Sequence, residues 1–271
     1  MIASAGRRRD IIDIPRLLRE RSPTLARRLP PGVTYLLQTV AHQELLNGVI
    51  RTSSRFSAGA FCEHLLRRLE ITVTVENEEH LRNTGRPVVC SNHPTGGVEG
   101  LALISTLLRV RGACRVPAND LLCLVPPLAS ILVPVNRGNP TRDGMKAFVN
   151  TFSGDDPILV FPAGVTARMR GGVLREYPWE SAFVTHARRA DREILPVSVS
   201  GTNSRHFYLI HRLRRVLGLS VNLEMALLVD ELLRRRGDTV VLRFLPGRSA
   251  WGPGRAEDRR QSAAIRREVC R

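Results

Sequence analysis

The chain has 271 residues, of which 43% are hydrophobic and 24% are charged, and this composition excludes an intrinsically disordered protein. Its formal charge of +16 calls for anionic partners: nucleic acid, anionic lipid, or an acidic carrier together with a phosphorylated substrate. Every basic residue except Lys146 is an arginine. A codon bias explains the preference for arginine over lysine, but it does not explain the net charge.

No apolar stretch reaches the roughly 18 residues that a membrane-spanning helix needs. The longest candidate, residues 124–135, is interrupted by Pro126, Pro127 and Pro134. No apolar segment follows the arginines at positions 7–9, so the start does not resemble a signal peptide, and we expect a cytoplasmic protein. The five cysteines form no Cys-x-x-Cys pair, which argues against a disulfide framework and against a metal site.

Residues 1–70 are expected to form helices, because their leucines and valines recur at spacings of three or four. Ser22-Pro23 and Pro30-Pro31-Gly32 separate these helices. Arginines are interleaved with the leucines, at Arg16, Arg19, Arg21, Arg27 and Arg28. A solvated helix face and a helix that lies on a membrane both explain this pattern. We take residues 1–70 as an N-terminal helical, membrane-surface segment.

From residue 71 onward, strands alternate with helices. Strands are predicted at 71–75, 87–90, 114–116, 131–135, 158–161, 194–199 and 240–244, and helices at 98–108, 121–128, 142–152, 179–190, 205–217 and 223–235. This alternation predicts a single α/β domain over residues 71–246, with a mixed central sheet flanked by helices and functional residues at the strand ends. Residues 247–271 are expected to be a loose basic tail.

The segment from Asn92 to Gly100 is the most informative. His93 follows a predicted strand, and Gly96-Gly97 allows a tight reversal before a helix whose first turn contains Glu99. A carboxylate that accepts from one ring nitrogen fixes the tautomer of a catalytic histidine and stabilises the imidazolium. A histidine at a strand end and a glutamate that serves the helix dipole would give the same pattern, so the spacing alone leaves both interpretations open.

A second segment, Phe161-Pro162-Ala163-Gly164, follows a buried strand, and Arg168 lies beyond it. Backbone N–H groups at such a turn bind anions or a developing oxyanion, although an ordinary strand-to-loop exit has the same sequence features. A third strand end presents Arg137.

Together these segments resemble the glycerophospholipid acyltransferase superfamily, which includes lysophosphatidate acyltransferases. The stretch that begins at His93 is similar to the His-Pro-x-Gly-Gly-x-Asp-Gly motif of the bacterial hemolysin-like branch, which contains N-acyltransferases that make ornithine and glycine lipids. Phe161 begins a stretch similar to the branch's Phe-Pro-Ala-Gly. The resemblance covers residues 10–246 and includes Gly201-Thr202-Asn203-Ser204, Phe207-Tyr208, Asn222, Glu224 and Met225.

The resemblance implies an acyl donor that is a thioester of acyl carrier protein or coenzyme A, an anionic membrane surface as a partner, and no bound cofactor. His93 would be the general base and Glu99 would orient it. Residues expected to bind substrate are Asn92, Gly96, Gly97, Arg137, Phe161, Pro162, Gly164 and Arg168. A peripheral location on the inner membrane follows from the same resemblance.

Two departures bear on the acceptor. Five residues separate His93 from Glu99 where the superfamily has four before an aspartate, and Ala163 stands where enzymes with phosphate acceptors have glutamate. Both favour an amine-bearing lipid acceptor, so we expect N-acylation, with O-acylation of lysophosphatidate as the alternative.

Two further classes stay open. The charge alone suggests a nucleic-acid-binding protein, but aromatic residues make up only 5% and no recognition motif is present, so we expect no specific nucleic acid. Glu99 and Ala163 are also compatible with an inactive relative that only binds lipid.

Overall fold

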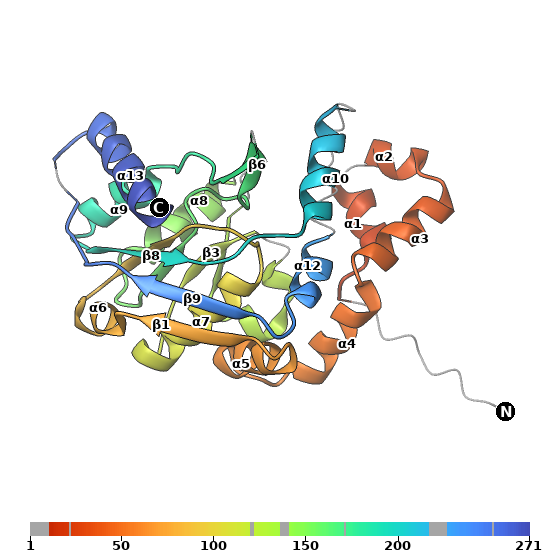
Figure 1. Cartoon of the computed structure of the whole chain (residues 1–271), viewed down its shortest axis with the longest axis horizontal. Helices are drawn as coiled ribbons and strands as arrows, with labels where there is room; N and C mark the ends of the chain where they lie inside the picture. The colour runs from red at the N-terminus through yellow and green to blue at the C-terminus, as the bar shows by residue number, and fades with distance from the viewer. Residues whose placement is uncertain are drawn as a thin grey trace.

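The computed structural model describes residues 11–21, 23–119, 122–135, 141–170, 172–216, 227–250 and 252–271. Its central sheet has five strands in the order β1-β9-β8-β2-β5 (Figure 1). These are β1 (Thr72–Glu76), β9 (Thr239–Phe244), β8 (Ile194–Val199), β2 (Val88–Ser91) and β5 (Ile158–Val160). Neighbouring strands are parallel except β8 and β9, which are antiparallel. The prediction of a mixed central sheet is confirmed.

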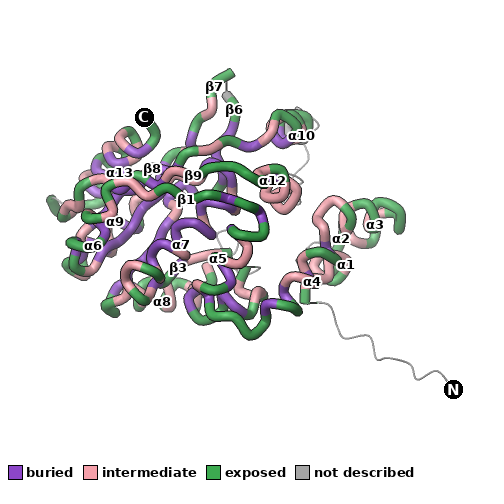
Figure 2. Tube along the Cα trace, turned by 60° about the horizontal axis from the view of Figure 1, so that its bottom comes forward, coloured by how far each residue is buried: buried purple, intermediate pink, exposed green. Residues whose placement is uncertain are grey.

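The central strands β2, β5 and β8 are apolar along their length because helices cover both faces of the sheet. Alternate residues point to opposite faces: Val89 packs with helices α5 (Ala58–Arg68) and α7 (Val98–Arg111). Val88 and Cys90 pack on the other face with α9 (Ala182–Arg189), α13 (Arg255–Val269) and the end of α8 (Arg142–Thr151). Figure 2 shows this buried centre between the two helical layers.

Two small sheets accompany the central one. Strands β3 (Val116–Ala118) and β4 (Leu132–Pro134) pair in parallel, and β6 (Arg168–Arg170) and β7 (Val173–Arg175) form an antiparallel hairpin. Between β3 and β4, where we expected a helix over 121–128, the described residues form only two short 3₁₀ turns, η1 (Leu122–Leu124) and η2 (Pro126–Leu128). The α-helix prediction was wrong because Pro126 and Pro127 lack N–H donors and disfavour a helical residue before them.

The helices expected over the first seventy residues are present. They are α1 (Ile14–Arg21), α2 (Pro23–Arg28), α3 (Pro31–Val40) and α4 (Gln43–Ser53), followed by α5. In both views α1 to α3 stand beside the α/β body rather than within it (Figures 1 and 2). Helix α3 buries none of its residues. The remaining helices of the described residues are α6 (Glu78–Asn83), α10 (Arg205–Val216) and α12 (Leu228–Arg234).

The expected loose tail is instead a packed helix. Ile265 and Val269 of α13 are 0% and 1% exposed, and Ser198 of β8 donates a hydrogen bond to the Val269 carbonyl oxygen at 2.7 Å. The buried Asp258 accepts from Arg188 of α9 at 3.1 Å. The sequence prediction was wrong because the helix has a narrow apolar face, with Ile265 and Val269 four residues apart, among many charged residues. None of the described helices is both long and apolar enough to cross a bilayer.

Candidate active site

The loop that carries His93 leaves the carboxyl end of β2 and is fixed by Asn92. The Asn92 amide donates to the Val199 carbonyl oxygen at 2.8 Å and accepts from the Val199 N–H at 2.7 Å. It therefore continues the hydrogen bonding between β2 and β8 past the end of the strand. We expected Asn92 to bind substrate. In the structure its amide instead holds the His93 loop against β8.

His93 and Glu99 are brought together as the sequence predicts. The His93 Nδ1 atom lies 3.0 Å from Oε1 of Glu99, and the two side chains are 20% and 1% exposed. Glu99 stands in the first turn of α7, so the helix fixes its backbone. An imidazole that is partly exposed and held by a buried carboxylate has the geometry of a general base.

The loop between the two residues wraps around the Glu99 carboxylate. The backbone N–H groups of Thr95 and Gly96 donate to Oε1 at 2.8 and 2.7 Å, and the Gly97 N–H donates to Oε2 at 3.2 Å. The Thr95 hydroxyl also contacts Oε2. The Glu99 side chain thus accepts from N–H groups at the start of helix α7. Gly96 and Gly97, expected to bind substrate, bind this carboxylate.

The ionised state of Glu99 follows from these contacts. Burial by itself would raise the pKa of Glu99, but the interactions with His93, Thr95 and the Gly96 N–H lower it to about 2. Glu99 is therefore a carboxylate at neutral pH, able to stabilise an imidazolium on His93.

Gly96 is required by its conformation and by its neighbours. Its φ is +90°, and a Cβ atom there would lie 2.5 Å from Thr166 Cγ2 and 2.8 Å from Leu228 Cδ2. Gly97 has a φ of −149°, and its added Cβ would meet only Leu232, at 3.8 Å. Only the first glycine of the pair is therefore fixed by strain and packing.

A second carboxylate, Glu176, was missed by the sequence analysis. Its Oε1 accepts the His93 backbone N–H at 3.0 Å, and its side chain is buried next to His93. Burial raises the pKa of Glu176 to about 7, although the hydrogen bond from the His93 backbone N–H and the electrostatic interaction with His93 oppose this. One signal was available in the sequence, because Glu176 is the only acidic residue between Asp156 and Glu180.

The Phe-Pro-Ala-Gly turn lies against the imidazole. The Phe161 ring centroid is 4.5 Å from that of His93, and Pro162 and Ala163 are buried. Gly164 has a φ of +63°, and its N–H donates to the Phe161 carbonyl oxygen at 2.9 Å. This N–H closes its own turn, and the expectation that backbone groups around Gly164 hold an oxyanion stays a prediction.

Arg168 is adjacent to the site but is buried. Its guanidinium donates to the Thr166 carbonyl oxygen at 2.7 Å and lies 4.9 Å from the Phe207 ring centroid. Through these contacts Arg168 packs β6 against α10. Arg137, the other arginine expected to bind substrate, lies outside the described residues.

The C-terminal motif at residues 201–204 is joined to α12. Glu231 is 4% exposed and accepts from both the N–H and the hydroxyl of Ser204 at 2.6 Å. Leu228 of the same helix reaches Gly96, so α12 braces the loop that holds Glu99. Asn222, Glu224 and Met225 lie outside the described residues.

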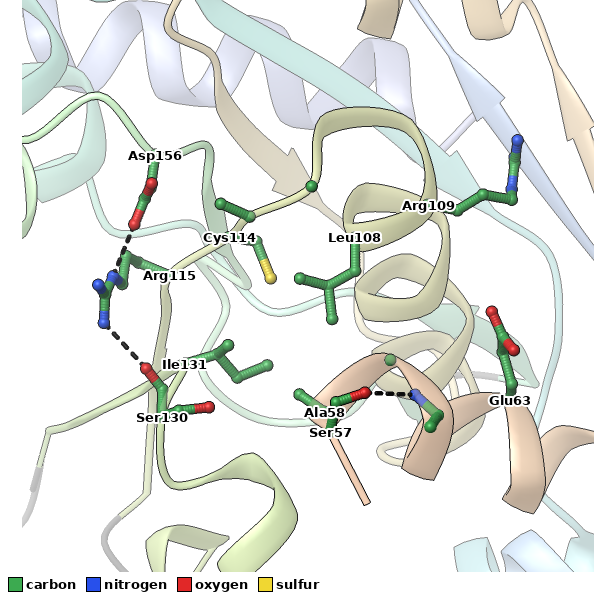
Figure 3. A pocket seen from close by; sticks show the side chains of 14 residues that line it. Ser57, Ala58, Glu63, Leu108, Arg109, Cys114, Arg115, Ser130, Ile131 and Asp156 are labelled. Carbon is green, nitrogen blue, oxygen red and sulfur yellow. Dashed lines mark hydrogen bonds and ion pairs between the residues drawn. The ribbon is translucent and has the colours of Figure 1, made fainter. Parts of the chain in front are cut away.

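A cavity of about 540 Å³ lies away from the histidine (Figure 3). Leu108 and Arg109, near the end of α7, line it together with Cys114 and Arg115. Glu99 stands at the start of the same helix, about 15 Å away at the usual rise of 1.5 Å per residue. The cavity therefore lies at the opposite end of α7 from Glu99 and His93.

Comparisons with known proteins show the family of the chain. The model of the acyltransferase family matches residues 16–268. A lyso-glycine lipid O-acyltransferase of Bacteroides thetaiotaomicron is 32% identical over 236 residues, which are 86% of this chain and 87% of the relative. One of Phocaeicola vulgatus is 32% identical over 234 residues, 86% of this chain and 84% of the relative.

The crystal structure of the 1-acyl-sn-glycerophosphate acyltransferase PlsC of Thermotoga maritima aligns with 87% of this chain and 94% of its own, with a TM-score of 0.47 and 14% identity. The family match and the two relatives span the motifs around His93 and Phe161. The chain therefore belongs to the acyltransferase family, within the glycerophospholipid acyltransferase superfamily, and is an enzyme that transfers acyl groups.

Proposed function

We propose that the enzyme transfers a fatty acyl group from a thioester to a hydroxyl group of a lyso-aminolipid, with His93 as general base. The observation that carries this proposal is the 3.0 Å contact between His93 Nδ1 and the buried, ionised Glu99. The donor is a thioester of acyl carrier protein or coenzyme A.

In this mechanism Glu99 keeps the proton of His93 on Nδ1, so that Nε2 takes the proton of the acceptor hydroxyl. The acceptor oxygen attacks the thioester carbonyl carbon and forms a tetrahedral intermediate. The carbon–sulfur bond then breaks, and the imidazolium returns its proton to the leaving thiolate. Glu99 stabilises the imidazolium between these two transfers.

The names of the two relatives support this acceptor class. Both are named for O-acylation of a lyso-glycine lipid, which combines an amino-acid headgroup with a hydroxyl acceptor. These names support our expectation of an acceptor with an amino-acid headgroup. They favour an ester product over the amide product that we expected from the sequence. A hydroxyl needs a base at the moment of attack, which is consistent with the His93–Glu99 arrangement.

The N-terminal helices support attachment to the cytoplasmic face of the inner membrane. Tyr35 and Leu36 of α3 are 72% and 58% exposed, and the net charge of the chain is +16. Apolar side chains among arginines bind anionic bilayers through burial and through charge attraction.

Acceptor competition tests the proposal. Purified enzyme is given one acyl thioester with equal amounts of lyso-glycine lipid, lysophosphatidate and free glycine, and the products are identified by mass spectrometry. We expect an ester on the lyso-glycine lipid to dominate. Amide formation on glycine, or an ester on lysophosphatidate alone, would overturn the acceptor assignment.

A further inference from the structure

We propose that α10 and the β6–β7 hairpin form a second bilayer-contacting surface beside the His93 loop, in addition to the N-terminal helices. We call this surface the lipid rim and define it by Met169, Val173, Leu209 and Leu213. The inference rests on the proposed function, because a lyso-lipid acceptor resides in a membrane.

Helix α10 has an inner and an outer face. Phe207 and His211 are 0% and 8% exposed and hold the helix on the body. Leu209 and Leu213, one turn apart, are 62% and 54% exposed on the other face. Leucines this exposed need a partner of low polarity, and no described segment of the chain covers them.

The hairpin projects from the body in both views (Figures 1 and 2). Met169 pairs with Leu174, and Val173 pairs with Arg170, so Met169 and Val173 point to opposite faces of the two-stranded ribbon. They are 41% and 55% exposed. A ribbon with exposed apolar residues on both faces suits insertion among lipid chains better than docking on a flat protein surface, which would cover only one face.

The two elements are adjacent and are tied to the catalytic loop. The Arg168 guanidinium lies 4.9 Å from the Phe207 ring, which joins the base of the hairpin to α10. Ala167, immediately before β6, donates its N–H to the His93 carbonyl oxygen at 2.9 Å. A bilayer in contact with the rim therefore lies close to the base that must meet the acceptor.

The charge of the rim fits an anionic bilayer. Arg205 and Arg212 lie on the exposed face of α10, and Arg175 is exposed at the base of the hairpin. Residues 164–175 and 205–216 contain no aspartate or glutamate. Arginines around inserted leucines reach the lipid headgroups while their stems remain in apolar surroundings.

Flotation with vesicles tests the rim without any substrate, so the result does not depend on the identity of the acceptor. One variant combines Leu209→Ser with Leu213→Ser, and another combines Met169→Ser with Val173→Ser. The control combines Met145→Ser with Val149→Ser on α8, whose side chains are 52% and 38% exposed. Figure 2 places α8 far from the hairpin and α10.

We expect each rim variant to bind phosphatidylcholine–phosphatidylglycerol vesicles about tenfold more weakly than the unchanged enzyme, since each loses two inserted apolar side chains. The control should bind as the unchanged enzyme does. Thermal unfolding and size-exclusion chromatography are measured for every variant. Unchanged vesicle binding by both folded rim variants would overturn the proposal. If these variants bind vesicles normally but lose self-association, the surface is instead a contact with a second copy of the chain.

Discussion

Nδ1 of His93 lies 3.0 Å from a carboxylate that is 1% exposed and that also receives the N–H groups of the intervening loop. Glu99 therefore has two sets of contacts. It contacts the ring of His93, the base of the proposed mechanism, and it completes the hydrogen bonding at the start of α7. Substitutions at Glu99 are expected to affect both catalysis and folding.

Glu99→Gln should lower turnover by about 10²–10⁴-fold, because an amide does not stabilise the imidazolium as a carboxylate does. The amide nitrogen cannot accept from the loop N–H groups, so the melting temperature should also fall. Steady-state assays and thermal unfolding measure the two effects. Glu79→Gln, at an exposed position of α6, is the control. Normal turnover in Glu99→Gln would remove Glu99 from the mechanism.

The same residue predicts a loss of stability in acid. Its pKa is lowered from 4.5 to about 2 in the folded protein, so its contribution is complete above pH 4.5 and disappears as the pH falls toward 2. Melting temperatures of the unchanged enzyme should fall more steeply over this interval than those of Glu99→Gln. Parallel curves for the two proteins would contradict the assignment.

Glu176 predicts a pH effect of opposite sign. Its pKa is raised from 4.5 to about 7 by burial, so the folded state retains a proton that the unfolded state releases. Stability from this group is complete below pH 4.5 and is lost as the pH rises through 7. Glu176→Gln should flatten the melting-temperature profile between those values. If Glu176→Gln leaves the melting-temperature profile unchanged, the Glu176 carboxyl does not titrate between these pH values in the folded protein.

The two loop glycines provide a matched pair. Gly96→Ala should destabilise the protein by about 1–3 kcal/mol, because its φ of +90° and its contacts with Thr166 and Leu228 leave no room for a methyl group. Gly97→Ala meets only Leu232 at 3.8 Å and should change stability much less. Denaturant unfolding compares the two variants. Equal losses would mean that the close contacts of Gly96 relax at little cost.

The local part of the site could be predicted from the sequence. His93, Glu99 and Phe161 were found because a histidine, a glycine pair and a carboxylate follow one strand, and a Phe-Pro turn follows another. The structure confirms that His93 and Glu99 meet, and it shows that Phe161, from another strand end, also contacts His93. Short-range spacing fixes the contact between His93 and Glu99, since a strand end and the first turn of the next helix are neighbours in space.

The long-range part could not be predicted. Glu176 reaches His93 across 83 residues, and Asn92 binds Val199 across 107 residues. Neither pairing leaves a periodic pattern, because both depend on the order of the strands in the sheet. The packed α13 was missed for a related reason: its few apolar residues show their role only beside α9 and β8.

The N-terminal helices make a separate prediction. A variant with Tyr35→Ser and Leu36→Ser should bind anionic vesicles more weakly, because both side chains are exposed on a helix that buries none of its residues. Binding of the unchanged enzyme should weaken as salt screens the arginines. Flotation at two salt concentrations measures both effects. Equal binding to neutral and anionic vesicles would argue against the electrostatic part.

The central claim is that His93 takes the proton of the acceptor. The most direct measurement is the rate of ester formation on lyso-glycine lipid by the unchanged enzyme and by His93→Ala, with the folded state of each confirmed by its melting temperature. The account predicts that folded His93→Ala is slower by about 10²–10⁴-fold, as expected for the loss of a general base. A folded His93→Ala enzyme that forms the ester at the normal rate would contradict it.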